Sequence, residues 1–434
     1  MNEKYDLKRF GADKIAFLGM FLISIFIANF LVSIRSDLNF SKPIELPHTG
    51  FSISIPTGKD WKSNNKWEYE KNAYVLSTNL VTGPNPFDAK VTCKYFFTSQ
   101  QEITPKSSID PQIKDSNNVV LETKLIEKGN LKIHWVHIDK PVTIYWAAAD
   151  LPNNRTITIE IYETTFNLEI AEKIFMKMID SLNFDEDNLV KTGAAFVADI
   201  KSKGIDSLIN SSNIQSCFFI KGPGDRNIGF NIEMLGILNG DELFTVRGAS
   251  ELFFSGSNSQ EQKSLFRCDE ALNKFIWQTR TNTRHSQTGE IIVMDETEKI
   301  SVTSQTYGTS ETYTNCSSVV PSLLLEPLIN PIVQNKIENA VIDVIDANGD
   351  ISPVLISFKP AEENDTKNSN IVYLEFLDGR GMSESFYLDE NNRIIRAEGT
   401  HFLERTDIDT IEKEFPGMSN YISEQLKMLD SNSI

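Results

Sequence analysis

An apolar run near the N-terminus constrains this chain more than any other feature. Residues 15–34 read IAFLGMFLISIFIANFLVSI and contain no charged side chain. In an α-helix, at about 1.5 Å per residue, such a run is about 30 Å long, which matches the hydrocarbon thickness of a bilayer. The sequence contains no second run of this kind. We therefore expect a single transmembrane anchor, Ile15–Ile34.

The basic residues around this run predict its orientation. Arg35 alone follows it closely, whereas four basic residues precede it: Lys4, Lys8, Arg9 and Lys14. Because positive charge stays on the cytoplasmic side, residues 1–14 should form a cytoplasmic stub and residues 36–434 should be extracytoplasmic, which means periplasmic in a bacterium. A cleaved signal peptide, which would leave a secreted protein, is the alternative, although its apolar part usually has only about 7–15 residues. A buried core helix is the third reading.

Length and charge limit the remaining classes of protein. At about 150 residues per domain, 434 residues suggest two or three domains. The chain has 42 Lys and Arg against 60 Asp and Glu, a net charge of −18. Because an acidic surface repels phosphate backbones, we expect no nucleic-acid partner. The predicted fold class is α+β: an N-terminal transmembrane helix followed by two antiparallel-sheet domains with packed helices.

The first extracytoplasmic domain is expected at residues 48–186, after a tether at 35–47. Phe51, Ile53 and Ile55 alternate with serines, as in a half-buried strand, and several hairpin patterns follow. Apolar residues then recur at helical spacing in NLEIAEKIFMKMIDSL, residues 167–182. The strand GFSISIP before a tryptophan, the hairpins and the closing segment AEKIFMKMIDSLNF resemble the PsbP-like α/β/α sandwich. That resemblance implies a binding or assembly module without catalytic residues.

The second domain is expected at residues 187–402, followed by a helical tail at 403–434. A helix at 189–203 precedes a series of strands, and a leucine-rich helical segment follows at 321–340, where Pro321, Pro327 and Pro331 must kink or split it. This order, with the IGF piece and the closing YLDENNRIIRAEG, resembles the LolA-like half-barrels of envelope lipoprotein carriers. The lipobox cysteine of lipid-anchored relatives is missing. The resemblance implies a carrier of an apolar ligand.

Motifs for chemistry are scarce. His134 and His137 lie three apart on an expected strand, so they should face opposite sides of the sheet. The sequence contains no HExxH, CxxC or GxSxG, and we expect no cofactor and no catalytic site. Asp346, Asn348 and Asp350 match the start of a calcium loop, but the expected glycine is Ile351 and the bidentate glutamate is missing. We interpret them as a turn, with a weak calcium site as the alternative.

Cysteines and tryptophans give two further expectations. Outside the cytoplasm disulfides are allowed, so one bridge among Cys217, Cys268 and Cys316 is possible, with two pairings of Cys217 left open, while Cys93 should be a buried thiol. Four of the five tryptophans fall in the first domain, where they either pack in its core or form a recognition surface: Trp61, Trp67, Trp135 and Trp146.

Three classes of function remain open on this sequence. We expect first a membrane-anchored, non-catalytic binding or assembly protein of the cell envelope, with a protein partner there. The alternative is a binder or carrier of an apolar small molecule or lipid through the second domain, which would need an apolar cavity of the order of several hundred Å³. An enzyme whose residues meet only in the folded chain is the third.

Overall fold

The computed structural model describes most of the chain from residue 39 to residue 431. The described ranges are 20, 23–24, 39–70, 73–81, 89–96, 99–100, 119–139, 143–152, 155–163, 168–185, 188–208, 215–236, 244–254, 258–314, 316–360, 370–399 and 402–431. The expected anchor Ile15–Ile34 therefore lies outside the described residues, except for Met20, Ile23 and Ser24. Within the described ranges, no helix combines the length and the apolar character needed to cross a membrane.

Antiparallel sheet dominates the chain, with a few helices, as the sequence predicted. The first sheet has eight strands in the order β10-β11-β12-β13-β8-β7-β5, and β6 also pairs with β7. The strands are β5 (Trp61–Ser63), β6 (Glu68–Glu70), β7 (Ala73–Leu80), β8 (Ala89–Phe96), β10 (Val120–Lys128), β11 (Leu131–Asp139), β12 (Thr143–Leu151) and β13 (Arg155–Glu163).

One face of the first sheet packs on a helix. The helix is α3 (Leu168–Ser181), and a small sheet of β2 (Ile44–Leu46), β3 (Phe51–Ile53) and β14 (Asn183–Phe184) lies beside it. Phe175, Met178 and Ile179 of α3 are fully buried in the same apolar cluster as Ile157, Ile159 and Ile161 of β13. The helical spacing predicted from the sequence therefore sets the contact between α3 and the sheet.

The second sheet contains sixteen strands, which run in the order β23-β24-β25-β26-β27-β28-β29-β15-β16-β17-β18-β19-β20-β21-β22-β9. Neighbouring strands are antiparallel except β23 and β24. The bounds are β9 (Ser99–Gln100), β15 (Gln215–Lys221), β16 (Asn227–Gly236), β17 (Phe244–Phe254), β18 (Asn258–Cys268), β19 (Phe275–Thr283), β20 (Gln287–Met294), β21 (Ile300–Ser304), β22 (Ser310–Thr314), β23 (Val319–Pro321), β24 (Asn339–Ile345), β25 (Ile351–Lys359), β26 (Ile371–Phe376), β27 (Ser383–Leu388), β28 (Ile394–Glu398) and β29 (Phe402–Thr406).

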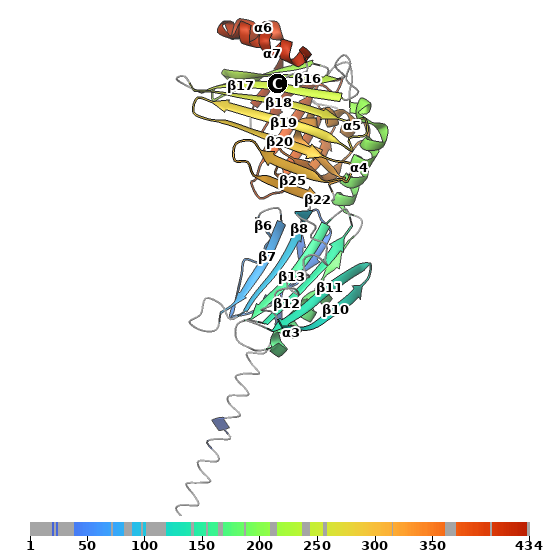
Figure 1. The fold of residues 1–434 in the computed structure, drawn as a ribbon. Coiled ribbons are helices and arrows are strands. Elements are labelled where there is room, and N and C mark those ends of the chain that lie inside the picture. The colour runs from blue at the N-terminus through green and yellow to red at the C-terminus, as the bar shows by residue number, and fades with distance from the viewer. Residues whose placement is uncertain are drawn as a thin grey trace, which may run out of the picture.

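This sheet curls around an interior (Figure 1), and one apolar cluster fills that interior. β22 and β23 lie near opposite ends of the strand order, yet Thr314 and Val319 are only a few residues apart in the chain. The Thr279 hydroxyl of β19 donates to the Ala347 carbonyl, in the β24–β25 turn, at 3.2 Å. One apolar cluster joins both walls, with Phe266 and Trp277 from one and Ile356 and Val372 from the other. The interior is therefore closed on several sides.

Two α-helices and two 3₁₀ turns fill one end of the interior. The helices are α4 (Leu189–Lys203) and α5 (Leu325–Gln334). The turn η1 (Ile205–Leu208) follows α4, and the turn η2 (Ser322–Leu324) precedes α5. Asn188 caps α4 by accepting the amides of Val190 and Lys191. The structure corrects the expected helix at 321–340, which is shorter than expected: Pro321 ends β23, α5 contains Pro331 and ends at Gln334, and β24 starts at Asn339.

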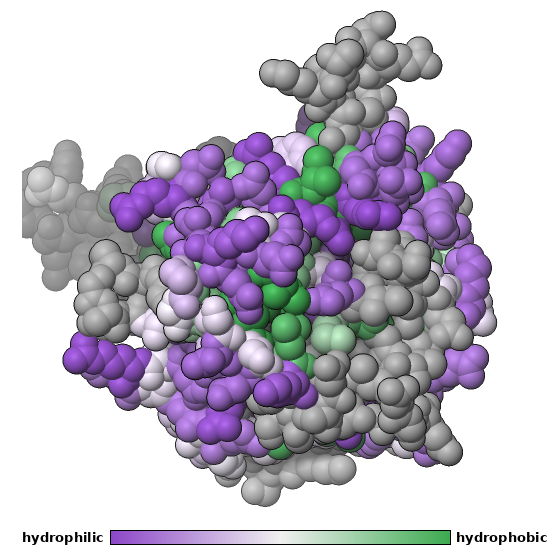
Figure 2. Space-filling model, turned by 90° about the horizontal axis from the view of Figure 1, so that it is seen from above, coloured by the Kyte–Doolittle hydropathy of each residue, from purple (hydrophilic) through white to green (hydrophobic). Residues whose placement is uncertain are grey.

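The C-terminal helices α6 (Ile408–Glu414) and α7 (Ser419–Ser431) cover the outer face of β15 and β16 (Figure 1). Ile411 and Ile422 are fully buried against Phe230 and Ile232. The helical tail was expected from residue 403, but β29 pairs with β15 there, so the helical part starts at Ile408. Seen from this end, most of the described surface is hydrophilic, and the hydrophobic residues gather in a narrow strip (Figure 2).

Contacts between distant segments link the part of the chain that forms the first sheet to the second sheet. Ser99 and Gln100 of β9 pair with Thr314 and Tyr313 of β22. A buried ion pair links Arg155 of β13 to Asp343 of β24. The extents 48–186 and 187–402 remain predictions for the two domains.

Candidate functional site

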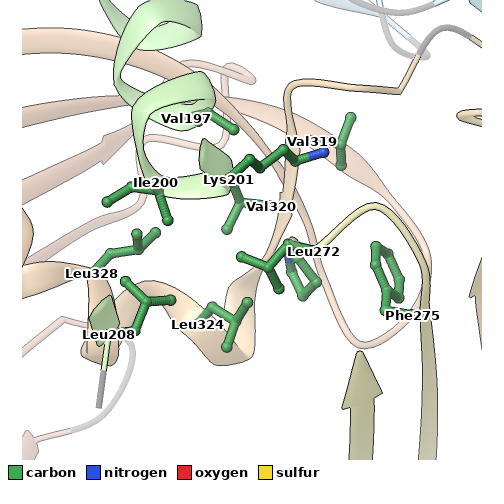
Figure 3. Close-up of a pocket in the computed structure, with 11 residues that line it drawn as sticks. Val197, Ile200, Lys201, Leu208, Leu272, Phe275, Val319, Val320, Leu324 and Leu328 are labelled. Carbon is green, nitrogen blue, oxygen red and sulfur yellow. The ribbon is translucent and has the colours of Figure 1, made fainter. Parts of the chain in front are cut away.

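A small apolar chamber lies where the helices enter the curled sheet (Figure 3). Its volume is about 10 Å³, which is room for about one water molecule. Eleven described residues line it, and ten of them are apolar. They are Val197, Ile200 and Lys201 of α4, Leu208 of η1, Leu272, Phe275, Val319, Val320, Pro321, Leu324 of η2 and Leu328 of α5.

Lys201 brings a charge to this apolar wall. Burial lowers the pKa of its ammonium group, and the carboxylates of Glu298 and Asp269 oppose that shift. Lys201 follows Val197 by four residues, so it occupies a position of α4 that faces the core. A negatively charged partner would stabilise a cation held among leucines and valines, because burial removes part of the cation's hydration.

Leu272 forms another part of the wall in an unusual conformation. Its φ is 56°, in the left-handed region that leucine rarely adopts, and its side chain is buried. Such a conformation costs about 1–2 kcal/mol for a residue with a Cβ atom. The same turn is tied to η1, since the Ile205 amide donates to the Glu270 carbonyl at 2.7 Å. Packing of Leu272 in the chamber must offset its backbone strain.

α4 can reach the sheet because of one glycine. A Cβ atom on Gly193 would lie 1.8 Å from the carbonyl oxygen of Val341 in β24. Gly193 therefore allows the backbone of α4 to approach β24 closely, which places Val197 and Lys201 at the chamber.

Two other hollows are open to solvent. A groove of about 640 Å³ runs along α4, between its outer side and Asn335 and Ile337. A cleft of about 300 Å³ lies on the first sheet, where Glu160 sits near Lys90 and Lys94. Burial raises the pKa of Glu160, and the two lysines oppose that shift. Neither hollow encloses an apolar surface as the chamber does.

The calcium-loop candidates form a hairpin turn between β24 and β25. The Asp346 carboxylate accepts the amides of Asn348 and Asp350 at 2.9 and 3.1 Å, and Gly349 supplies the positive φ of 89°. The carboxylates of Asp295 and Asp389 accept hydrogen bonds in the same way, from the backbone amides two and four residues further along the chain. The repeated geometry supports the turn interpretation. Among the described residues, no group of three or more His, Cys, Asp or Glu side chains could hold a metal ion.

The four tryptophans do not share one surface. Trp135 is buried against α3, where its ring centroid lies 5.6 Å from that of Phe175, and Trp61 and Trp67 pack at the border of the same cluster. Trp146 lies on the opposite face of the sheet, with Val136 and Ile138. Core packing accounts for the first three, so the structure gives no common recognition surface for the set.

The histidines and cysteines also lie apart. His137 stacks on Tyr145 at 4.2 Å between ring centroids, while His134 pairs with Ala148 on the other face. His48 and His285 lie in turns, and His401 is outside the described residues. Cys93, Cys217, Cys268 and Cys316 are all free and buried. The structure therefore corrects the expectation of a disulfide among Cys217, Cys268 and Cys316. Cys217 belongs to a different apolar cluster from Cys268 and Cys316.

Sequence reasoning missed the chamber. Its lining comes from three stretches of the chain, 197–208, 272–275 and 319–328, and only the folded chain brings them together. The one available signal was Lys201, a charged residue that follows the apolar Val197 by four positions in the expected helix at 189–203.

Comparisons with known proteins leave the family open. No protein-family model and no curated protein sequence matches this chain. Among solved structures, a beta-barrel-like protein of the domain of unknown function DUF1849 from Brucella abortus is similar over 44% of this chain and 95% of its own, with 11% identity and a TM-score of 0.33. A DUF1089 family protein from Pseudomonas aeruginosa is similar over 38% of this chain and 87% of its own, with 11% identity and a TM-score of 0.25. Such low scores carry no argument, and none of these matches shows the PsbP-like resemblance.

Proposed function

We propose that this chain is a non-catalytic binding protein of the cell envelope, anchored in a membrane by residues 15–34, and that the chamber takes an amphiphile with an apolar tail and an anionic head. The observation that carries the proposal is the composition of the wall: ten apolar residues and Lys201. An apolar tail would be buried among the ten apolar residues, and a carboxylate or phosphate head would contact the ammonium group of Lys201 at the rim.

Ligand entry requires the wall to move. Small-molecule sites usually measure about 300–1,000 Å³, far more than the closed chamber provides. The movable part is the segment 319–334, because it consists of a short strand, a 3₁₀ turn and the ten-residue helix α5, and because Pro331 removes one hydrogen bond within α5. Val320, Leu324 and Leu328 of this segment would then contact the tail.

The test measures binding of dodecanoate and of dodecanol to the full chain in detergent micelles, by displacement of a fluorescent fatty-acid analogue. We expect Lys201→Met to weaken dodecanoate binding by about tenfold to a hundredfold, since a charged hydrogen bond contributes about 1.5–3 kcal/mol. Binding of dodecanol should change little. Lys203→Met is the matched control, because Lys203 lies on the same helix but pairs with Asp199 at the surface.

Leu328→Trp adds a second variant, which should fill the chamber and weaken binding of both probes while circular dichroism shows the native fold. The proposal fails if the wild-type chain binds neither probe saturably. It also fails if Lys203→Met weakens dodecanoate binding as much as Lys201→Met does, because the loss would then reflect the overall surface charge and not a contact with Lys201.

An assembly role through the first sheet is the second candidate, and β10 favours it. This nine-residue strand is at the end of the described strand order, and its Leu121 and Leu125 side chains are each 51% exposed. An extended segment of a partner protein could pair with such an edge. A photo-crosslinking residue at Leu125 should capture a partner at the membrane, whereas one at the exposed Tyr307, in the turn between β21 and β22, should not. Equal adducts from both positions would contradict this role.

A further inference from the structure

A polar cleft lies on the face of the first sheet that does not pack on α3. The strands that form it are β6, β7, β8 and β13, which are neighbours in that sheet (Figure 1). Its volume is about 300 Å³, at the lower end of the usual range for small-molecule sites. Its polar lining includes Ser77, Lys90, Thr92, Lys94, Glu160 and Tyr162.

Alternation along β8 separates the cleft from the core. Cys93 and Tyr95 are buried in the apolar cluster that contains the inner side of α3. Because successive side chains of a strand point to opposite faces, Lys90, Thr92 and Lys94 point the other way, into the cleft. The two lysines are four positions apart, about 13 Å along the strand, and the Thr92 between them is only 6% exposed. A buried hydroxyl group therefore lies between two ammonium groups.

The strand register places a carboxylate beside these lysines. Glu160 of β13 pairs directly with Thr92, and Thr92 pairs with Ser77 of β7 on its other side. Lys90 and Lys94 are therefore the diagonal neighbours of Glu160, at about 7–8 Å. In the described part of the chain, both lysines act on Glu160 through their charge, and no hydrogen bond joins the side chains. Opposite charges thus face a shared space without direct contact.

Glu160 lacks a donor on the strands beside it. Its partners across the two neighbouring strands are Thr92 and Trp146, and both are uncharged. Burial raises the pKa of the Glu160 carboxyl, and the charges of Lys94 and Lys90 oppose that shift. A partly buried carboxylate of this kind is stabilised by a hydrogen-bond donor that enters the cleft.

The lining of the cleft is suited to an uncharged ligand that is rich in hydroxyl groups. Its two ammonium groups are matched by two carboxylates, Glu160 and the exposed Glu70 of β6. A ligand hydroxyl can donate to a carboxylate and accept from an ammonium group at the same time, so it can bridge the charges that the strand register holds apart. Ser77 and Thr92 add two more hydroxyl groups, and the ring of Tyr162 offers an apolar surface.

We propose that this cleft binds a hexose unit of a carbohydrate, whose adjacent hydroxyl groups bridge Glu160 to the two lysines while its C–H face lies against Tyr162. An anion is less suited to the cleft, because Glu160 and Glu70 would repel it, and the lysines would repel a cation. The cleft shares no lining residue with the chamber of the second sheet, so the inference goes beyond the proposed function and does not depend on it.

Ligand-observed NMR tests the cleft with glucose, galactose and mannose, added to the full chain in micelles of a detergent that has no sugar head group. We expect saturable binding of at least one of these sugars. A rise from about 0.05 to about 0.5 M sodium chloride should change the affinity by less than about twofold, because the ligand carries no charge to be screened. Lys94→Met and Glu160→Met should each weaken binding by about tenfold or more, since each removes a hydrogen bond to a charged group.

Lys132→Met is the matched control. Lys132 is an exposed residue of β11, three strands from β8, and it precedes the core residue Ile133, so it lies on the face of the cleft but outside it. This variant should bind the sugar as the wild-type chain does, and circular dichroism checks that all variants keep the native fold.

Three results would overturn the site. They are no saturable binding of any of the three sugars, an equal loss in Lys132→Met and Lys94→Met, and displacement of the sugar by equimolar acetate or methylammonium, which would show that the cleft selects a charge. Dodecanoate binding is measured separately. A chain that binds a sugar but no dodecanoate would support this site and refute the proposed function alone.

Discussion

The guanidinium of Arg155 donates two hydrogen bonds to the carboxylate of Asp343, at 2.7 and 2.9 Å, although the two residues are 188 positions apart. Their side chains are only 3% and 1% exposed. Arg155 begins β13 in the first sheet, and Asp343 lies in β24 of the second. Tyr95 of β8 also hydrogen-bonds to Arg155, and burial raises the pKa of its hydroxyl to about 12. The pair therefore fixes the position of one sheet against the other with a directional, two-bond contact.

Removing one member of this pair should be costly. Arg155→Met leaves the Asp343 carboxylate buried without its cation, and we expect the free energy of unfolding to fall by about 3–5 kcal/mol. Burial already raises the pKa of Asp343, and Arg155 opposes that shift, so the variant should lose most stability where the carboxylate must stay charged. Urea unfolding followed by circular dichroism measures the change.

Two further variants make the Arg155 result interpretable. Arg155→Met combined with Asp343→Leu removes both charges and should recover much of the loss, because a buried pair can be replaced by apolar groups of similar size. Lys203→Ala breaks the exposed pair with Asp199 and should cost less than about 1 kcal/mol. A loss of similar size in Arg155→Met and Lys203→Ala would show that the buried pair does not join the sheets.

Much of the fold could be predicted from local patterns, and the exceptions have physical causes. α4 was predicted with the bounds Leu189–Lys203, because its apolar spacing and its cap both lie within one short segment. β24 was missed, since NAVIDVI is buried on both faces and shows no alternation, and the leucine-rich helix before it was extended too far. The curl of the sixteen-stranded sheet depends on pairings such as β15 with β29, which no local pattern encodes.

The candidate site was beyond sequence reasoning for the same reason. Lys201 and Leu272 both line the chamber and are 71 positions apart. A lysine near the end of a helix is ordinary, because it suits the helix dipole. Only the folded chain places Lys201 beside Leu272.

A methyl group on Gly193 should displace α4. In Gly193→Ala the new Cβ would overlap the Val341 carbonyl at 1.8 Å, so α4 must move from β24, and we expect a loss of about 2–4 kcal/mol in the free energy of unfolding. Gly417→Ala is the matched control, since a Cβ there meets nothing within 4 Å, and it should change stability by less than about 1 kcal/mol. Equal effects in thermal unfolding would mean that the close contact is not needed.

Asp346 should act as a turn residue and not as a calcium ligand. Asp346→Ala removes two hydrogen bonds from backbone amides, and we expect a loss of about 1–3 kcal/mol. Asp389→Ala removes the equivalent bonds in another turn and should cost a similar amount. Millimolar calcium should leave the melting temperature of the wild-type chain unchanged. A rise with calcium that disappears in Asp346→Ala, but not in Asp389→Ala, would restore the calcium site.

The four cysteines should be counted as thiols that react only after unfolding. Cys93, Cys268 and Cys316 are at most 1% exposed, and burial raises the pKa of all three. Cys217 is 5% exposed, and burial raises its pKa to about 11. Because the thiolate is the reactive form, a maleimide should label the native chain slowly, and Cys217 should react first.

Mass spectrometry of the labelled chain separates this expectation from a disulfide. In denaturant without reductant, four maleimides should add to the wild-type chain and three to Cys217→Ser, because every thiol is then accessible. Two additions to the wild-type chain would instead reveal a bridge. Since Cys217 lies under α6 and α7 while Cys268 and Cys316 lie inside the curled sheet, a bridge from Cys217 would require the sheet between them to open.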